Sequence, residues 1–173
     1  NPAEMKDPTL IIYDAMVEEN GIFAVSNGAQ TNDIAQKGFI VALNKWGYEP
    51  DAPNFTPRIF GECRIDAYTP FTLAIIRKSQ NAEPERERHS YRLRDLPPGY
   101  GVCITTYVGD GNPLPSFKGK PYPLPLLGDI KNVANTIWEV LNPDNRVSLV
   151  VKFIDISSGR SRIEIINKFT EVA

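Results

Sequence analysis

Two prolines, Pro53 and Pro57, place the strongest local restraint on this chain, because they lie within a short polar segment at residues 51–59. Each proline fixes its own φ angle and favours extended geometry in the residue before it. The residues between the prolines therefore have little conformational freedom. We expect a stiff loop that presents a carboxylate, an amide, a hydroxyl and a guanidinium in a small space, from Asp51, Asn54, Thr56 and Arg58.

Such a loop has two interpretations that composition alone does not separate. Binding and catalytic residues are often carried by loops on a rigid scaffold. A proline-rich loop can equally serve only as a corner at which the chain turns. Both interpretations stay open on the residues of this segment.

The composition excludes several classes of function. The 173 residues carry a net charge of −2 and are 42% hydrophobic and 23% charged, which is typical of one globular domain over residues 1–173. A nearly neutral chain gives no electrostatic basis for binding nucleic acid or a membrane surface. No apolar run approaches the ~20 residues of a membrane span, and the first residues contain no apolar signal core.

The cysteine and histidine content argues against a metal site. Cys63 and Cys103 lie far apart in strand-like runs, which indicates reduced core thiols of a cytoplasmic protein. Only His89 adds a soft ligand, and no Cys-x-x-Cys pair is present, so we expect no bound metal. We interpret His89 as a surface residue of a short strand.

Hydrophobic periodicity predicts an α+β fold in which helices pack on antiparallel strands. The first two strands are expected to form a hairpin around Asn20-Gly21, a strong turn signal. Residues 79–88 are charged with alternating sign and predict a solvated loop. The predicted strands cover residues 9–13, 22–25, 59–65, 71–77, 90–93, 100–108, 146–154 and 162–166.

Two helices are expected. The first is predicted to begin after Thr31 or Asn32 as a cap. Its apolar face is expected to hold Ile34, Val41 and Ala42. The second covers residues 129–141, where apolar side chains follow the helical period, and Gly128 or Asp129 caps it.

Polar residues gather where predicted strands end. A group at 27–31 precedes a helix, where free N–H groups suit a phosphate or carboxamide ligand, although a capped turn explains one or two of these residues. Another group, at 110–112, follows a predicted strand. If these strand ends share one edge of the sheet, the polar residues meet in one cleft. They are Asn27, Gln30, Thr31, Asp51, Asn54, Thr56, Arg58, Asp110 and Asn112.

Four motifs in register carry a resemblance to a known family. They are LIIYDAM at 10–16, SNGAQT at 26–31, DAPNFTPRI at 51–59 and DGNPLPSF at 110–117. Together they resemble the inosine monophosphate (IMP) cyclohydrolase family of the archaeal type, and its bacterial branch most. The resemblance implies an αββα sandwich of antiparallel sheets with flanking helices, like that of the N-terminal nucleophile hydrolases. Family members carry a further arginine-bearing leading segment, which we expect this chain to lack.

The resemblance also implies an activity. This is the closure of 5-formamidoimidazole-4-carboxamide ribonucleotide (FAICAR) to IMP with loss of water, a cyclic amidine hydrolase reaction of purine biosynthesis. It implies a purine ribonucleotide as the small-molecule partner and no cofactor or metal. The oligomeric state stays open, with a homo-oligomer among the options.

Roles for individual residues follow as a hypothesis. Tyr13 would shuttle a proton or donate to the oxyanion, although a structural tyrosine at a sheet edge explains it nearly as well. Arg58 would bind the 5′-phosphate or polarise the formyl oxygen. Asp110 would accept a proton from the attacking nitrogen or bind the ribose, with Asn112 beside it. The remaining substrate-binding candidates are Asn27, Gln30, Thr31, Asp51, Asn54 and Thr56.

Two other functions are considered. A non-catalytic module would keep the amide-rich cleft and bind a purine nucleotide without turning it over. An amidohydrolase of the same fold would need a nucleophilic Cys, Ser or Thr at the mature N-terminus, which Asn1 cannot provide.

Overall fold

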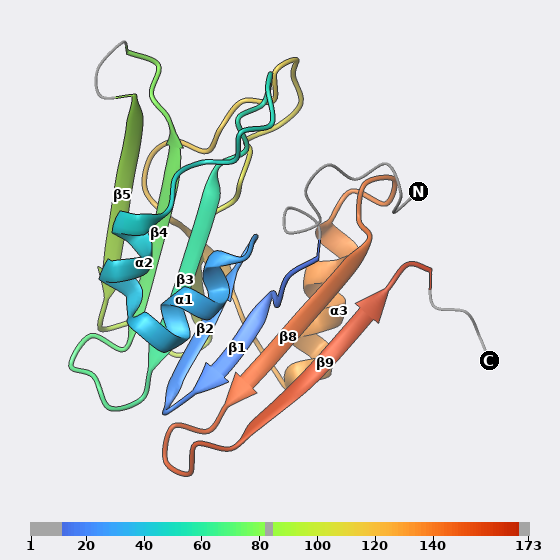
Figure 1. The fold of residues 1–173 in the computed structure, drawn as a ribbon. Coiled ribbons are helices and arrows are strands. Elements are labelled where there is room, and N and C mark those ends of the chain that lie inside the picture. Colours follow the sequence, from blue (N-terminus) through green and yellow to red (C-terminus); the bar gives the residue numbers. More distant parts are fainter. Residues whose placement is uncertain (1–11, 82–84, 170–173) are drawn as a thin grey trace. The chain divides into compact units, whose positions relative to one another are not determined.

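The computed structural model describes residues 12–81 and 85–169 (Figure 1). Packing divides the chain into two compact units, which are described separately. The first comprises Asn1–Asp95 and Cys103–Tyr122, and the second comprises Leu96–Val102 and Pro123–Ala173.

The first unit is built on a five-stranded antiparallel sheet in the order β1-β2-β3-β4-β5. Each strand pairs with its neighbour in sequence, so the sheet is a meander. The strands are β1 (Met16–Glu19), β2 (Ile22–Ser26), β3 (Arg58–Arg64), β4 (Phe71–Lys78) and β5 (Arg86–Leu93).

The turn between β1 and β2 confirms the predicted hairpin. Asn20 and Gly21 have φ angles of 51° and 75°, the pair of positive values that a two-residue hairpin turn requires. The first strand is nevertheless four residues long and starts at Met16, so the prediction of a strand at 9–13 is wrong for Tyr13. Residues 9–11 lie outside the described residues. The two-residue turn fixes the register of β1 on β2, because it pairs Glu19 directly with Ile22.

Helices α1 (Gln30–Lys37) and α2 (Phe39–Lys45) pack on one face of this sheet (Figure 1). The sequence predicts one helix across this region, but Gly38, with φ of 90°, separates the two. The break changes the helical phase, so Val41 is 52% exposed instead of buried. The predicted cap at Thr31 or Asn32 is also wrong, because α1 begins after Ala29, which makes no side-chain capping hydrogen bond.

The core of the first unit lies between these helices and the sheet. Phe60 of β3 is 1% exposed, and its ring centroid lies 6.1 Å from that of Phe39 in an edge-on arrangement. Side chains alternate along a strand, so residues 58, 60, 62 and 64 of β3 share this helix-facing side. The core members are Ala24, Ile34, Ala35, Phe39, Ala42, Leu43, Phe60, Ala74 and Ile76.

Strand β5 corrects the prediction of a loop at 79–88. Residues 86–88 belong to β5, which pairs with β4 along its whole length. The alternating charges fall on opposite faces of the strand. Glu87 pairs with Arg77 at 2.7 Å, whereas Arg88 donates to the carbonyl of Leu43 at 2.9 Å on the helix-facing side.

Strand β6 (Tyr100–Cys103) pairs with β7 (Tyr122–Pro125). The predicted strand at 100–108 is therefore too long. Beyond Cys103 the chain forms only an isolated bridge between Tyr107 and Ser116.

The second unit contains α3 (Ile130–Val140) and the hairpin of β8 (Ser148–Ile154) and β9 (Ser161–Asn167). The helix packs against both strands of this hairpin. The predicted helix at 129–141 is confirmed, and the Asp129 carboxylate caps it by accepting from the Asn132 amide at 2.8 Å. The described residues thus form an α+β protein with antiparallel sheets and three helices. None of the helices in the described ranges is long and apolar enough to cross a membrane.

Candidate functional site

The polar residues near the start of β3 form a connected network, which we call the amide–arginine network: Asn27, Gln30, Glu49 and Arg58. Asn27 lies between β2 and α1 and binds the main chain on both sides of Arg58. Its Nδ2 donates to the carbonyl of Pro57 at 2.8 Å, and its Oδ1 accepts from the amide of Ile59 at 2.8 Å. The Asn27 side chain therefore fixes the position of the Arg58 backbone.

Gln30, the first residue of α1, connects Asn27 to the guanidinium. It is completely buried. Its Nε2 donates to Asn27 Oδ1 at 3.2 Å, and its Oε1 accepts from Arg58 Nη1 at 2.8 Å. A buried carboxamide is tolerated here because both of its ends are hydrogen-bonded.

Arg58 is 5% exposed, which is unusual for an arginine. Its Nη1 lies 3.2 Å from Glu49 Oε1, and its Cζ lies 4.8 Å from the centroid of the Trp46 ring. Opposite charge, a carboxamide acceptor and an aromatic face together compensate for its lost hydration. The guanidinium is therefore held in one position.

Glu49 is a member of this network that the sequence analysis missed. It is 8% exposed, and its amide donates to the carbonyl of Thr56 at 2.9 Å, so it is tied to the proline-rich loop. Burial raises the pKa of Glu49, Arg58 lowers it, and the nearby Asp51 raises it further. Its only cue in the sequence is its position two residues before that loop.

Gly28 makes the close packing of the network possible. A Cβ atom at this position would lie 2.2 Å from Arg58 Nη1 and 2.5 Å from Gln30 Oε1. Its carbonyl accepts from the hydroxyl of Thr31 at 2.9 Å and from that of Ser26 at 3.0 Å. Thr31 is completely buried, so its hydroxyl closes the strand-to-helix turn from within.

The proline-rich loop is closed by Asp51 and Thr56. The Asp51 carboxylate accepts from the Thr56 amide at 2.6 Å and from the Thr56 hydroxyl. Lys78 lies over the Phe55 ring, with its Nζ 3.5 Å from the centroid. Phe55 has a φ of 46°, a left-handed conformation that is uncommon for a residue with a side chain.

The same loop contacts the segment that follows β6. The Thr56 hydroxyl lies 2.5 Å from the Tyr107 hydroxyl, and Asn54 Oδ1 accepts from the amide of Leu114 at 3.1 Å. Tyr107 is a second residue that the sequence analysis missed. A tyrosine near the end of a predicted strand that leads into a candidate loop is its only signal.

The remaining candidates, Asp110, Asn112 and Tyr13, are less closely connected to the network and the proline-rich loop. Asp110 and Asn112 are exposed and lie in the segment that the loop contacts. Tyr13 is half-buried and precedes β1. Among the described residues, no side-chain hydrogen bond joins these three residues to the amide–arginine network or to Asp51, Asn54 or Thr56.

Asp33 supports the network from α1. Its carboxylate binds Lys37 at 2.7 Å, Lys45 at 2.5 Å and Trp46 Nε1 at 2.8 Å. Burial raises its pKa, but the hydrogen bonds from Lys37, Lys45 and Trp46 outweigh this and bring the pKa to about 2. Asp33 thereby orients the Trp46 ring on which Arg58 lies.

The chemistry of the donor set favours recognition of an organic ligand over a metal. Within residues 12–81 and 85–169, no three His, Cys, Asp or Glu side chains are grouped so that they could hold a metal ion. The candidate groups are carboxamides, hydroxyls, carboxylates and one fixed cation. Such groups hydrogen-bond the polar edge of a planar molecule.

The fold and the network thus define an α+β protein with an amide-rich candidate site. The particular family follows from comparison with known proteins, because the model of the family described as "IMP cyclohydrolase-like protein" matches residues 1–159. The chain belongs to this family, as its motifs indicated. A search of curated proteins finds no match to the chain.

Proposed function

We propose that this protein is an IMP cyclohydrolase, which closes FAICAR to IMP with loss of water. The observation that carries the proposal is the family match over residues 1–159. The amide-rich chemistry of the network agrees with a substrate whose reacting groups are a carboxamide and a formamide. A purine ribonucleotide is accordingly the proposed partner.

The reaction joins two groups of one molecule. The carboxamide nitrogen attacks the formyl carbon, and the new C–N bond closes the six-membered ring. One proton leaves the carboxamide nitrogen and another leaves the formamide nitrogen, and both depart with the formyl oxygen as water. The main task of the protein is to rotate the two groups into contact, and orientation of this kind can supply up to ~7–11 kcal/mol.

Asn27, Gln30, Asn54 and Thr56 are proposed to hold the reacting groups, with Thr31 and Asp51 supporting them. The support for this assignment is their rigidity. Asn27 and Gln30 are fixed by hydrogen bonds to the main chain and to Arg58. Groups that are positioned before the substrate arrives lose little entropy when it binds.

Arg58 is proposed to polarise the formyl oxygen or to bind the 5′-phosphate. Its burial favours the first role, because a charge acts more strongly on an enclosed carbonyl than in water. Glu49 and Gln30 hold its guanidinium in place, so little reorganisation is needed as negative charge develops.

Proton transfer is assigned to residues outside the network. Tyr13 is proposed to deliver a proton to the oxyanion, and Asp110 to accept the proton from the attacking nitrogen or to bind the ribose. Asn112 is proposed to bind beside Asp110. Asp110 is exposed, which agrees with a side chain that makes its contacts only when the substrate binds.

The family assignment also supports an αββα sandwich of the N-terminal nucleophile hydrolase type. The five-stranded sheet with α1 and α2 on one face corresponds to one helical and one sheet layer of such a sandwich.

A purine-nucleotide-binding module without catalysis is the second candidate. The observation that favours it is that polar groups of the network form hydrogen bonds with one another, as Arg58 and Gln30 do. In that case the amide-rich site would recognise a nucleotide but would not turn it over.

The test is cyclisation kinetics with FAICAR, together with calorimetry of IMP binding. We expect Tyr13→Phe to lower kcat by ~10²-fold or more, whereas the exposed Tyr100→Phe serves as a matched control without effect. Arg58→Lys, which keeps the charge, should retain more turnover than Arg58→Ala. Wild-type turnover and affinity in both Tyr13→Phe and Arg58→Ala would refute the roles, and IMP binding without turnover in the wild type would favour the module.

A further inference from the structure

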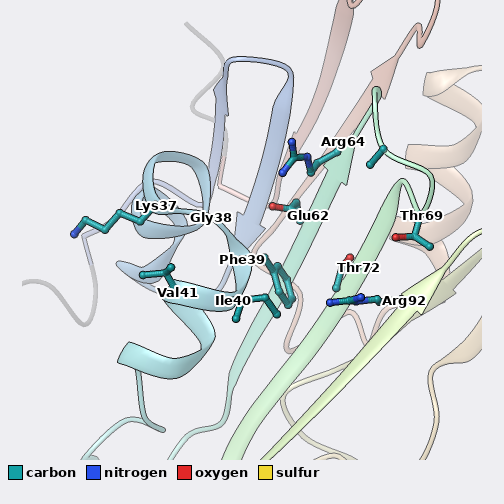
Figure 2. A pocket seen from close by; sticks show the side chains of 11 residues that line it. Lys37, Gly38, Phe39, Ile40, Val41, Glu62, Arg64, Thr69, Thr72 and Arg92 are labelled. Atoms are coloured by element: carbon teal, nitrogen blue, oxygen red, sulfur yellow. The ribbon is translucent and has the colours of Figure 1, made fainter.

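A second polar site lies toward the opposite end of β3 from the amide–arginine network. A hollow of about 370 Å³ opens between α2 and the helix-facing side of the sheet (Figure 2). Arg58 begins β3 and Arg64 ends it. At ~3.3 Å per residue these positions are roughly 20 Å apart, and buried Phe60 lies between them. The hollow is therefore separate from the candidate active site.

Strand register places the polar residues of this hollow side by side. Glu62 of β3 pairs with Thr72 of β4, and Thr72 pairs with Arg92 of β5, so the three form a row across the sheet. Arg64 lies two residues further along β3 on the same face. Figure 2 shows these side chains on the strands, with Phe39 of α2 close to Glu62 and Thr72. Two guanidinium groups thus flank a carboxyl and a hydroxyl.

Two buried atoms of this hollow lack a hydrogen-bond partner within the described part of the chain. They are Glu62 Oε1 and Arg64 Nε. The Asp66 carboxylate lies 3.6 Å from Arg64 Nε, which is too far for a hydrogen bond. Buried polar groups without partners cost free energy. A ligand that offers an acceptor to Arg64 and a donor to Glu62 would remove both costs.

The charge balance of the hollow favours an anion. Lys37 also lines it, but its ammonium is bound to Asp33 at 2.7 Å. Arg64 forms a looser ion pair, at 3.6 Å, with the exposed carboxylate of Asp66, so the two arginines supply most of the charge for a ligand. Burial raises the pKa of Glu62, while Arg64 lowers it.

We propose that this hollow binds phosphate, either as inorganic phosphate or as the phosphate group of a small monoester. The phosphate oxygens lie between Arg64 and Arg92, whose planar guanidinium groups match them with paired hydrogen bonds. Thr69 and Thr72 provide hydroxyl donors, and Glu62 accepts from a hydroxyl of the ligand. The hollow shares no residue with the amide–arginine network, so the proposal does not rest on the proposed function.

Isothermal titration calorimetry of the full chain tests the proposal with three probes: ribose 5-phosphate, inorganic phosphate and ribose. We expect both phosphates to bind and ribose not to bind. Arg64→Gln and Arg92→Gln should each weaken phosphate binding by about tenfold or more, because each removes one guanidinium. Arg162→Gln, an exposed arginine of β9, is the matched control and should leave the affinity unchanged.

The same titration, followed through backbone amide NMR shifts, locates the bound phosphate and also distinguishes its source. Shifts at Thr69 and Thr72 support the proposal. Tighter binding of ribose 5-phosphate indicates a monoester ligand, whereas equal affinities indicate free phosphate. The proposal would be overturned by shifts confined to the 27–31 and 51–58 segments. It would also be overturned by equal phosphate affinity in the wild type and both arginine variants. Arg64 and Arg92 are both partly solvent-exposed, so these variants are expected to fold.

Discussion

Replacing Gly28 with alanine tests whether the amide–arginine network is as tightly packed as the structure indicates. The added Cβ would lie 2.2 Å from Arg58 Nη1 and 2.5 Å from Gln30 Oε1. Neither side chain can move into solvent, because Arg58 is 5% exposed and Gln30 is completely buried. The hydrogen bond between them must therefore lengthen or break.

The expected cost follows from two contributions. Overpacking of a buried site costs ~1–3 kcal/mol, and loss of a hydrogen bond to a charged group costs ~1.5–3 kcal/mol. The two overlap, so we expect Gly28→Ala to lower the free energy of unfolding by about 3 kcal/mol. The φ angle of Gly28 lies outside the positive range, so backbone strain does not contribute.

Urea denaturation measures this change, with Gly47→Ala as the matched control. Gly47 also lacks a positive φ, and its Cβ would lie 3.2 Å from Arg86 Nη1, the end of an exposed and flexible side chain. We expect Gly47→Ala to change stability by less than ~1 kcal/mol. A loss in Gly28→Ala no larger than that of the control would refute the described packing.

Three further predictions concern the same unit. Glu49→Gln should lower the free energy of unfolding by ~2 kcal/mol, because buried Arg58 then loses its negative partner; a urea midpoint equal to that of the wild type would contradict this. The pKa of Asp33 is lowered from 3.8 to about 2. Its contribution to stability is therefore complete above pH ~4 and is lost as the pH falls through 2. It amounts to ~1 kcal/mol after screening around the half-exposed lysines. Asp33→Asn should flatten this acid-induced loss in urea titrations between pH 7 and pH 2, and an unchanged slope would argue against the lowered pKa. Phe60→Ala should cost ~3–5 kcal/mol in thermal or urea unfolding, whereas Phe71→Ala, at a residue that is 36% exposed, should cost clearly less; equal losses would contradict the assigned core.

The sequence predicted correctly those elements for which all the local signals agreed. Helix α3 combines an apolar face with the Asp129 cap, and it lies within one residue of its predicted bounds at each end. The Asn20-Gly21 turn was predicted for the same reason, since few other conformations suit that pair.

The errors arose where tertiary contacts decide the structure. The first residues of β5, 86–88, were missed because their charges resemble those of a loop, although they alternate between a helix-facing side and an opposite side. The division of α1 from α2 depends on a single glycine, Gly38, whose conformation the helical period does not reveal. Glu49 was missed because its burial results from the packing of Arg58 and Trp46, which lie apart in sequence.

Strand β5 has a consequence for how this chain behaves at high concentration. Among the described strands it has a neighbour on one side only, so its outer edge is not paired with another strand of the described residues. The main-chain groups of such an edge can pair with other molecules. Five of its eight residues, RERHSYRL, are arginine, glutamate or histidine, and three of these are arginines. Two copies that met edge to edge would bring these cations together and would have to remove their water. The charges that made residues 86–88 resemble a loop are thus expected to oppose aggregation through this edge of the sheet.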